Sequence, residues 1–224
     1  MGHQCKPRCP ARVMAGSEGV DDREALTELL GGVEPWDGIE ADHVAFAQGW
    51  VAGGAELYRA GRPDNPAVHL VSYFVPFDEE SGRLLLTAHR KSGLWLPPGG
   101  HVEPGETPWE ATFRETAEEL GIVATPWPGC GTVPLFVTAT MTRGPAPHTD
   151  VSLWHVIAAS PDDIDGFDER EFEAVRWVGL SEACAEPEES TDPHLARFSA
   201  KLEHARRDAP RGSLRRATTT ARRK

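Results

Sequence analysis

Apolar residues gather into short runs from residue 68 onward, and turn-forming residues separate these runs. The run 68–77 is apolar on both faces, which predicts a central strand of a sheet. Turns at 78–82 and 91–93 divide it from the runs that follow. Strands are therefore predicted at 68–77, 83–90, 94–96, 131–141, 150–160 and 172–180, and Pro134 indicates an edge or a bulge in the fourth of them.

Helical patterns precede and follow these strands. Residues 23–31 and 41–52 have helical apolar spacing, and a pair of glycines ends each segment. A last helix is predicted from Asp192 to about residue 207. We expect a disordered N-terminus at 1–22, a helical extension with its linker at 23–65, a main domain at 66–207 and a basic disordered tail at 208–224. The extension packs on the main domain, forms a dimer contact or covers the substrate, and the sequence does not decide between these placements.

The segment 108–120 is predicted to form a helix with complete start and stop signals. Thr107 is a favourable N-cap, Pro108 suits the first helical position, and Glu110 completes a capping box. Gly121 supplies the C-terminal cap because glycine tolerates a positive φ. At about 100° per residue, one side of this helix is predicted to be apolar and to face the core (Trp109, Phe113, Ala117, Leu120), and the opposite side carries Glu115, Glu118 and Glu119.

These three glutamates are in electrostatic conflict. Glu118 and Glu119 follow Glu115 by three and four residues, and like charges at those spacings destabilise a helix. A bound divalent cation would resolve the conflict, and an ordinary solvated acidic face is the alternative. Carboxylate ligands favour Mg²⁺ or Mn²⁺ over Zn²⁺. The preceding loop contains Gly99 and Gly100, which allow the backbone to approach a ligand closely.

The run 100–122 resembles the signature of the Nudix hydrolases. That signature is glycine, five residues, glutamate, seven residues, and then Arg-Glu-aliphatic-x-Glu-Glu-x-Gly-aliphatic. The chain departs from it at Thr116, where the family usually has an aliphatic residue. The resemblance implies an α/β fold, the Nudix-type α/β/α sandwich with a mixed β-sheet, preceded here by the helical extension. The matching positions are Gly100, Glu106, Arg114, Glu115, Glu118, Glu119, Gly121 and Ile122.

The resemblance also implies a metal site and the residues that build it. Glu115, Glu118 and Glu119 are expected to hold Mg²⁺ (or Mn²⁺) and to include the catalytic carboxylates. The carbonyl of Gly99 is expected to be a further ligand. Arg114 is expected to orient a motif glutamate through charge-assisted hydrogen bonds.

Three motif positions are expected to support this site. Glu106 supports the junction between loop and helix, and Gly100 and Gly121 complete the motif. The general base stays open, because in the family it can also come from a later loop. The acidic segment 168–173 is the place to look for it, with Glu171 as a candidate and a solvated loop as the alternative.

Several side chains around the motif are candidates for substrate contacts. His101 lies where it could meet phosphates, with a hydrogen-bonded imidazole as the alternative. His148 and Asp150 open a predicted strand and are candidates for the mouth of the site. The remaining candidates are His89, Arg90 and Lys91 for phosphates, and Trp95, Trp154 and Phe74 for stacking on a base or filling the core.

Composition bounds the remaining possibilities. The chain has 224 residues and a net charge of −12, and the last 16 residues carry six basic residues and no acidic one. The rest of the chain is therefore more acidic still and should repel nucleic acid. It has no apolar stretch of membrane-spanning length and no signal-peptide pattern, so a cytoplasmic protein is expected. Its four cysteines do not suggest a disulfide framework, and Cys5 and Cys9 are expected in a disordered terminus.

The resemblance implies a Mg²⁺-dependent hydrolase acting on a diphosphate bond in a nucleoside diphosphate linked to another group. Nucleotide sugars, ADP-ribose-like compounds and nucleoside triphosphates all stay open as substrates, and a homodimer is possible. One alternative is an enzyme similar to isopentenyl-diphosphate isomerase, although no cysteine stands at 96–99 before the motif. The other is a non-catalytic nucleotide-binding regulator, a class that typically loses motif glutamates.

Overall fold

The computed structural model describes residues 22–62, 65–143 and 146–209. The predicted disordered terminus, apart from Asp22, and the tail from residue 210 onward lie outside these residues, as do Cys5 and Cys9. Within the described ranges, no helix is long and apolar enough to cross a bilayer. The helices are α1 (Asp22–Gly31), α2 (Gly38–Ala52), α3 (Pro108–Leu120), α4 (Leu180–Ala183) and α5 (Leu195–Asp208), with a 3₁₀ turn η1 (Pro161–Asp163).

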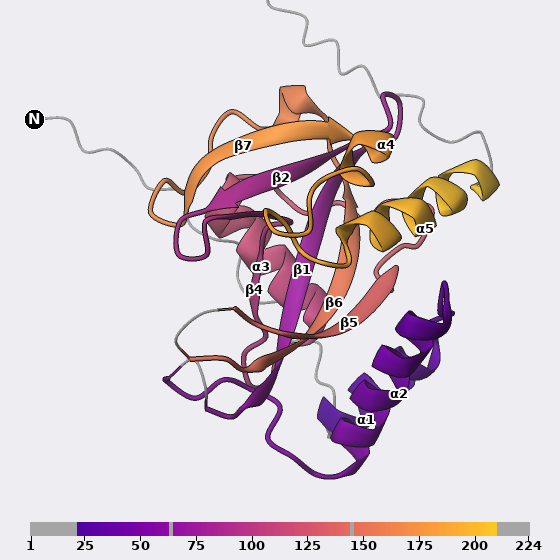
Figure 1. The fold of residues 1–224 in the computed structure, drawn as a ribbon, viewed down its shortest axis with the longest axis vertical. Coiled ribbons are helices and arrows are strands. Elements are labelled where there is room, and N and C mark those ends of the chain that lie inside the picture. Colours follow the sequence, from indigo (N-terminus) through magenta and orange to yellow (C-terminus); the bar gives the residue numbers. More distant parts are fainter. Residues whose placement is uncertain (1–21, 63–64, 144–145, 210–224) are drawn as a thin grey trace, which may run out of the picture.

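The strands form a single mixed sheet (Figure 1). Its path runs β3-β2-β1-β6-β5, while β4 also pairs with β1 and β7 also pairs with β2. The β1–β6 pair is parallel and the others are antiparallel. The central position predicted for 68–77 is thus confirmed. The strands are β1 (Val68–Asp78), β2 (Arg83–His89), β3 (Leu94–Leu96), β4 (Gly99–His101), β5 (Phe136–Met141), β6 (Thr149–Ala158) and β7 (Phe172–Gly179).

Two strand predictions need correction. The strand expected from residue 131 begins only at Phe136, after Pro134, which cannot donate a hydrogen bond to a ladder. β5 is an edge strand, as that proline indicated. The loop predicted at 96–100 includes β4, where Gly99 pairs with Tyr73 and Gly100 with Ser72. Glycine is poorly suited to strands, so this pairing depends on β1 and was not visible locally.

The alternation of side chains along the strands builds a core on each face of the sheet. Phe74 of β1, Leu85 of β2 and Ile157 of β6 pack with Leu120 at the end of α3. The neighbouring side chains point the other way and pack against Leu195, Phe198 and Leu202 of α5; they are Val75, Leu84, Leu86 and Val156. Helices therefore cover both faces, which is the predicted α/β/α arrangement (Figure 1).

The N-terminal helices pack on the sheet beside α3. Leu26 and Leu30 of α1 and Val44 of α2 share a buried cluster with Leu70 and Leu153 of the sheet. Of the three placements that the sequence left open, packing on the main domain is the one observed. Because this cluster continues the core, the extension and the sheet are held together by buried apolar surface.

Candidate active site

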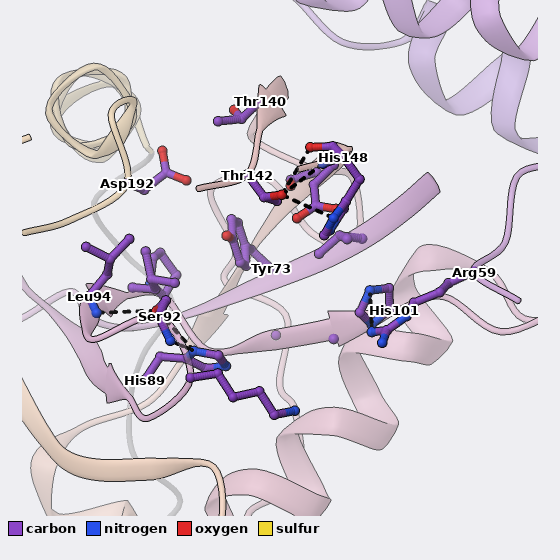
Figure 2. A pocket seen from close by; sticks show the side chains of 18 of the residues that line it. Arg59, Tyr73, His89, Ser92, Leu94, His101, Thr140, Thr142, His148 and Asp192 are labelled. Carbon is purple, nitrogen blue, oxygen red and sulfur yellow. Dashed lines mark hydrogen bonds and ion pairs between the residues drawn. The ribbon is translucent and has the colours of Figure 1, made fainter. Parts of the chain in front are cut away.

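A cavity of about 1050 Å³ is lined by segments far apart in the sequence. Figure 2 shows how side chains from the linker, β1, β2, β4 and the segments beside β5 and α5 surround it. α3 contributes Glu115 and Glu119, and β4 contributes Gly99 and Gly100. The motif therefore borders a space of the size of a small-molecule site.

Local signals fix the ends of α3 as predicted. Thr107 caps the first turn, and both hydrogen bonds of the capping box with Glu110 are present. Gly121 ends the helix with φ 68°, in the left-handed region. The helix spans Pro108–Leu120, which are the bounds that the sequence predicted.

The predicted buried side of α3 is wrong at its centre, although Leu120 is buried and Trp109 packs against the same core cluster. Phe113 is 48% exposed, and Ala117 is exposed as well. The side that faces the sheet carries Ala111, Thr112 and Thr116, all fully buried. Small side chains there allow the helix to lie close to β1, where the Ser72 hydroxyl donates to the carbonyl of Pro108 at 2.9 Å. Glu115 and Glu119 lie on this same side by helical spacing, so the helix turns two glutamates inward.

Glu115 rests against the backbone of β4. A Cβ atom at Gly100 would lie 2.0 Å from Glu115 Oε1, so only glycine leaves room for this carboxylate. Arg114 Nη1 donates to the same Oε1 at 2.7 Å. The guanidinium also makes a bidentate pair with Glu106, with both N···O distances at 2.9 Å, and donates to the carbonyl of His101 at 3.1 Å. Arg114 thus links the loop before α3 to Glu115.

The carboxylates of Glu106 and Glu115 stabilise the positive charge of Arg114. The hydrogen bonds to Glu106 and Glu115 hold the pKa of the guanidinium above its usual value, although burial opposes that shift. Burial raises the pKa of Glu115, and Arg114 counters that rise.

Glu119 is the most strongly perturbed carboxyl of the motif. Its side chain is buried, with the residue 4% exposed, and its Oε2 atom has no hydrogen-bond partner within the described part of the chain. Burial, followed by the nearby charges of Glu115 and Glu171, raises the pKa of Glu119 to about 9, against a smaller lowering by the backbone of Gly99. A buried carboxylate with an unsatisfied oxygen is costly without a cation.

Glu171 joins this group from the turn before β7. It lines the cavity, and its charge raises the pKa of both Glu115 and Glu119. The turn that carries it is anchored, because Asp168 N donates to the carbonyl of Glu119 at 2.7 Å and Arg90 N donates to that of Glu171 at 2.9 Å. The structure therefore brings the candidate from the later loop next to the motif.

Glu118 is not part of this inward group. Its side chain is 62% exposed and lies 3.7 Å from Arg114, on the solvent side of α3. The inward carboxylates are thus Glu115, Glu119 and Glu171. All three carboxylates line one cavity, although the structure does not gather one oxygen from each of them within 4.8 Å of the others; carboxylate oxygens favour a hard divalent cation such as Mg²⁺ or Mn²⁺.

Basic and polar groups line other parts of the cavity. Arg59 Nη1 lies 3.2 Å from His101 Nε2, and Figure 2 shows the two side chains together. Burial and the neighbouring Arg59 lower the pKa of His101 to about 4, so its imidazole is neutral at pH 7. Lys91 and Arg143 also line the cavity. These cations can offset the negative charge of phosphates.

Two further cavity residues had no sequence signal. Asp192 precedes α5 and is 6% exposed, and burial raises its pKa to about 6. Tyr73 of β1 packs edge-on against Trp154 at 4.9 Å between ring centroids, and burial raises its pKa. Both line the cavity near Thr140 (Figure 2). Tyr73 comes from a strand and Asp192 from a loop far along the chain, so no motif in the sequence indicates that they share a cavity.

Two of the three aromatic candidates lie inside the cores, and the third packs against one of them. Phe74 and Trp154 are fully buried in the two cores, so they fill the core, which was the alternative to stacking on a base. Trp95 lies under the guanidinium of Arg176, 4.2 Å from the ring centroid. His89, Lys91, His101, His148 and Asp150 line the cavity, Arg90 does not, and a contact of these side chains with substrate stays a prediction.

Comparisons with known proteins agree with the motif. The family model for the NUDIX domain matches residues 68–202. Pig bis(5'-nucleosyl)-tetraphosphatase [asymmetrical] is 35% identical over 109 residues, covering 45% of this chain and 66% of that protein. The CTP pyrophosphohydrolase of Escherichia coli is 32% identical over 127 residues, covering 54% of this chain and 86% of that protein. The chain thus spans slightly less than two thirds of the tetraphosphatase it matches.

A solved structure with similarity is a NUDIX-family hydrolase from Clostridium perfringens. It has a TM-score of 0.47 and 19% identity, and the match covers 61% of this chain and 97% of that one.

Proposed function

The chain belongs to the Nudix family, and on that premise we propose that it is a metal-dependent pyrophosphohydrolase that hydrolyses a diphosphate bond in a nucleotide. The substrate class is a nucleoside diphosphate linked to another group, such as a sugar, a ribose phosphate or a further phosphate. The observation that carries this proposal is Glu119, a buried carboxylate with an unpartnered oxygen at the cavity wall, close to the charges of Glu115 and Glu171.

Mg²⁺, or Mn²⁺ in its place, is the cation that this set of oxygens favours. Glu115 and Glu119 would hold it, and the carbonyl of Gly99 and Glu118 remain predicted ligands that no observed contact supports. When bound, the cation neutralises phosphate charge and lowers the pKa of a coordinated water. The proposed main domain, 66–207, contains all of these residues.

The chain's own residues supply position and proton transfer. Arg114 holds Glu115 in place, and the pair with Glu106 fixes Arg114 in turn. Glu171 faces the motif from an anchored turn, which makes it the candidate to accept a proton from the attacking water. Arg59 lines the same cavity beside His101 and is a candidate to offset charge on the phosphate chain.

The names of the relatives indicate which substrates to test first. Their names say that they act on a bis(5'-nucleosyl) tetraphosphate and on CTP. A cavity of about 1050 Å³ is at the upper end of small-molecule sites, which suits a nucleotide carrying a further group. Polar groups such as the buried Asp192 and the half-buried Thr140, whose Oγ1 atom is itself buried, are candidates to read the base or the sugar.

The two alternative functions are less well supported. An isomerase of the isopentenyl-diphosphate type would place a cysteine at the site, and neither Cys130 nor Cys184 lines the cavity. Burial raises the pKa of Cys130 to about 11, which makes its thiol unreactive. A non-catalytic regulator would not need the complete motif. Turnover therefore decides between these classes.

The test is a substrate panel in the presence of Mg²⁺ or Mn²⁺. A dinucleoside tetraphosphate, CTP, ADP-ribose and a nucleotide sugar are incubated with the full chain, and the products are separated by anion exchange. Reaction in ¹⁸O-labelled water then shows which phosphorus is attacked. Hydrolysis of one member is expected, and absence of turnover with every member and both metals would reject the proposal.

Variants then assign the roles. Glu119→Gln should lower kcat by about 100-fold or more, because it removes a charge from the cation site. Glu171→Gln should lower kcat by about 10²–10⁴-fold if this carboxylate is the general base. Glu173→Gln is the matched control, since its side chain is 63% exposed two residues further along the same strand region. Equal activity in the Glu171 and Glu173 variants would remove Glu171 from the mechanism.

A further inference from the structure

Outside the glutamate cluster, two histidines and an aspartate converge at the start of β1 and β6. His148 and Asp150 are two residues apart in an extended segment, so their side chains point to the same side. The parallel register of β1 and β6 places His69 directly opposite Asp150. Strand pairing therefore brings together three potential metal ligands that are far apart in the sequence.

The distances within this triad suit a shared ion. His69 Nε2 lies 3.1 Å and His148 Nε2 lies 3.3 Å from the same atom, Asp150 Oδ1. All three ligand atoms lie within 4.8 Å of one another. Ligand atoms held about 2.0–2.1 Å from a tetrahedral ion are about 3.3 Å apart, so the triad needs little rearrangement to bind one.

Hydrogen bonds orient both imidazoles toward this point. His69 Nδ1 lies 3.1 Å from the carbonyl of Pro66, and His148 Nδ1 lies 2.9 Å from the carbonyl of Ala146. A carbonyl only accepts, so both Nδ1 atoms carry a proton, and the tautomer protonated at Nδ1 has its lone pair on Nε2. The Thr142 hydroxyl lies 3.1 Å from His148 Nδ1 and 3.2 Å from the carbonyl of His148. It can donate its proton to that carbonyl and accept from Nδ1, so its position agrees with a proton on Nδ1.

This arrangement leaves acceptors facing one another. His69 is fully buried, and neither its Nε2 nor Asp150 Oδ1 makes a hydrogen bond with another described residue, despite their separation of 3.1 Å. Two imidazole lone pairs and a carboxylate oxygen without a proton between them are unfavourable. A cation at their centre removes that cost. Metal-bound histidines typically donate their other N–H to a backbone carbonyl, as both do here.

We propose that His69, His148 and Asp150 form a separate metal site for Zn²⁺ or another divalent ion that prefers imidazole. Two nitrogens and one oxygen select such an ion over Mg²⁺, so the site differs in chemistry from the glutamate cluster. His148 and Asp150 line the cavity, which gives the ion an entry path and directs its open coordination position into that space. His101, with its ring centroid 5.0 Å from that of His69, lies beside the site and contacts Arg59.

The test is Zn²⁺ binding to the full chain after removal of metals with a chelator, measured by titration calorimetry. His148→Ala and Asp150→Asn should weaken binding at one site by about 100-fold or more. His204→Ala is the matched control, because His204 is an exposed histidine that also pairs with a carboxylate, Asp208, at 3.2 Å. Circular dichroism checks that each variant folds, and His148, at the cavity, is preferred over the fully buried His69.

A glutamate variant and the Co²⁺ absorption spectrum distinguish this site from other sites that could bind a divalent cation. The double variant Glu115→Gln/Glu119→Gln should retain the Zn²⁺ site, which makes the result independent of hydrolase activity. Co²⁺ in place of Zn²⁺ should give visible absorption without a thiolate charge-transfer band. Unchanged affinity in the His148 and Asp150 variants, loss of all binding in the glutamate variant, or a thiolate band would each overturn the proposal.

Discussion

A buried ion pair between α2 and α5 should make the stability of the fold sensitive to the loss of one partner. Glu40 is fully buried, and Lys201 Nζ donates to its two carboxylate oxygens at 2.9 and 3.0 Å. The carboxylate also accepts from the backbone N–H of Trp36 at 2.6 Å and of Val137 at 3.2 Å. One glutamate thus joins the helical extension, the edge strand β5 and the last helix.

Lys201→Met keeps most of the apolar stem and removes the charge, together with the hydrogen bonds that Nζ donates to Glu40 and, at 2.6 Å, to the carbonyl of Glu34. At about 3 Å and an effective dielectric constant of 20, the lost attraction is roughly 5 kcal/mol. Breaking a buried pair from one side typically costs about 3–5 kcal/mol, because the remaining charge stays buried without its partner. We therefore expect the free energy of unfolding to fall by about 3–5 kcal/mol, a large part of the typical total of about 5–15 kcal/mol. The melting temperature should fall by roughly 6–20 °C.

The assay is urea unfolding followed by tryptophan fluorescence and circular dichroism. Lys91→Met, at an exposed turn, is the matched control and should change stability by less than about 0.5 kcal/mol. The double variant Glu40→Gln/Lys201→Met should recover part of the loss, since it no longer buries an unpaired charge. A loss below about 1 kcal/mol in Lys201→Met would refute the reasoning, because it would mean that Glu40 is solvated or uncharged in the folded protein.

Three further perturbations test the site and the core. Gly100→Ala places a methyl group 2.0 Å from Glu115 Oε1. The rate of hydrolysis should therefore fall at least about 10-fold, and the free energy of unfolding should drop by about 1–3 kcal/mol. Full activity would contradict the close approach of Glu115 to Gly100. Arg114→Lys loses the bidentate pair with Glu106 and should lower kcat by about 10–100-fold with little change in KM, and steady-state kinetics checks this. Burial lowers the pKa of His155 to about 4, below its unfolded value of about 6.5, so the stability that it contributes is present above pH 6.5 and is lost as pH falls toward 4. His155→Gln should therefore reduce the acid-induced loss by up to about 3 kcal/mol relative to the parent chain, measured by urea unfolding across that range, and an identical pH slope would disprove the assignment.

The bounds of α3 were predictable because their causes are local. A capping box at Thr107 and a left-handed glycine at 121 act within a few residues, so the sequence displays them directly. The rotation of that helix was not predictable from its apolar residues. Contact with β1 favours small and hydroxyl-bearing side chains such as Thr112 and Thr116, and this leaves Phe113 exposed. Close approach, rather than hydrophobicity, decides which side is buried.

The composition of the site was only partly predictable. Glu115, Glu119 and the supporting Arg114 could be named from the motif, and Glu171 was a candidate from an acidic loop. The inward turn of Glu119 and the exposure of Glu118 follow from how α3 packs on the sheet. Asp192 and Arg59 enter the cavity from a loop and a linker that carry no recognisable pattern.

The sequence by itself determined the acidic motif, the helix that presents it and most strands, because capping, turns and apolar runs act over short distances along the chain. Only the tertiary structure decided which glutamates meet in the cavity, where the N-terminal helices pack, and that His69 lies opposite Asp150. These features depend on strand pairing and on contact between segments that are distant along the chain. The energy of such contacts depends on which residues are neighbours in space. The motif therefore identifies the chemistry, and the packing around it selects the residues that can perform it.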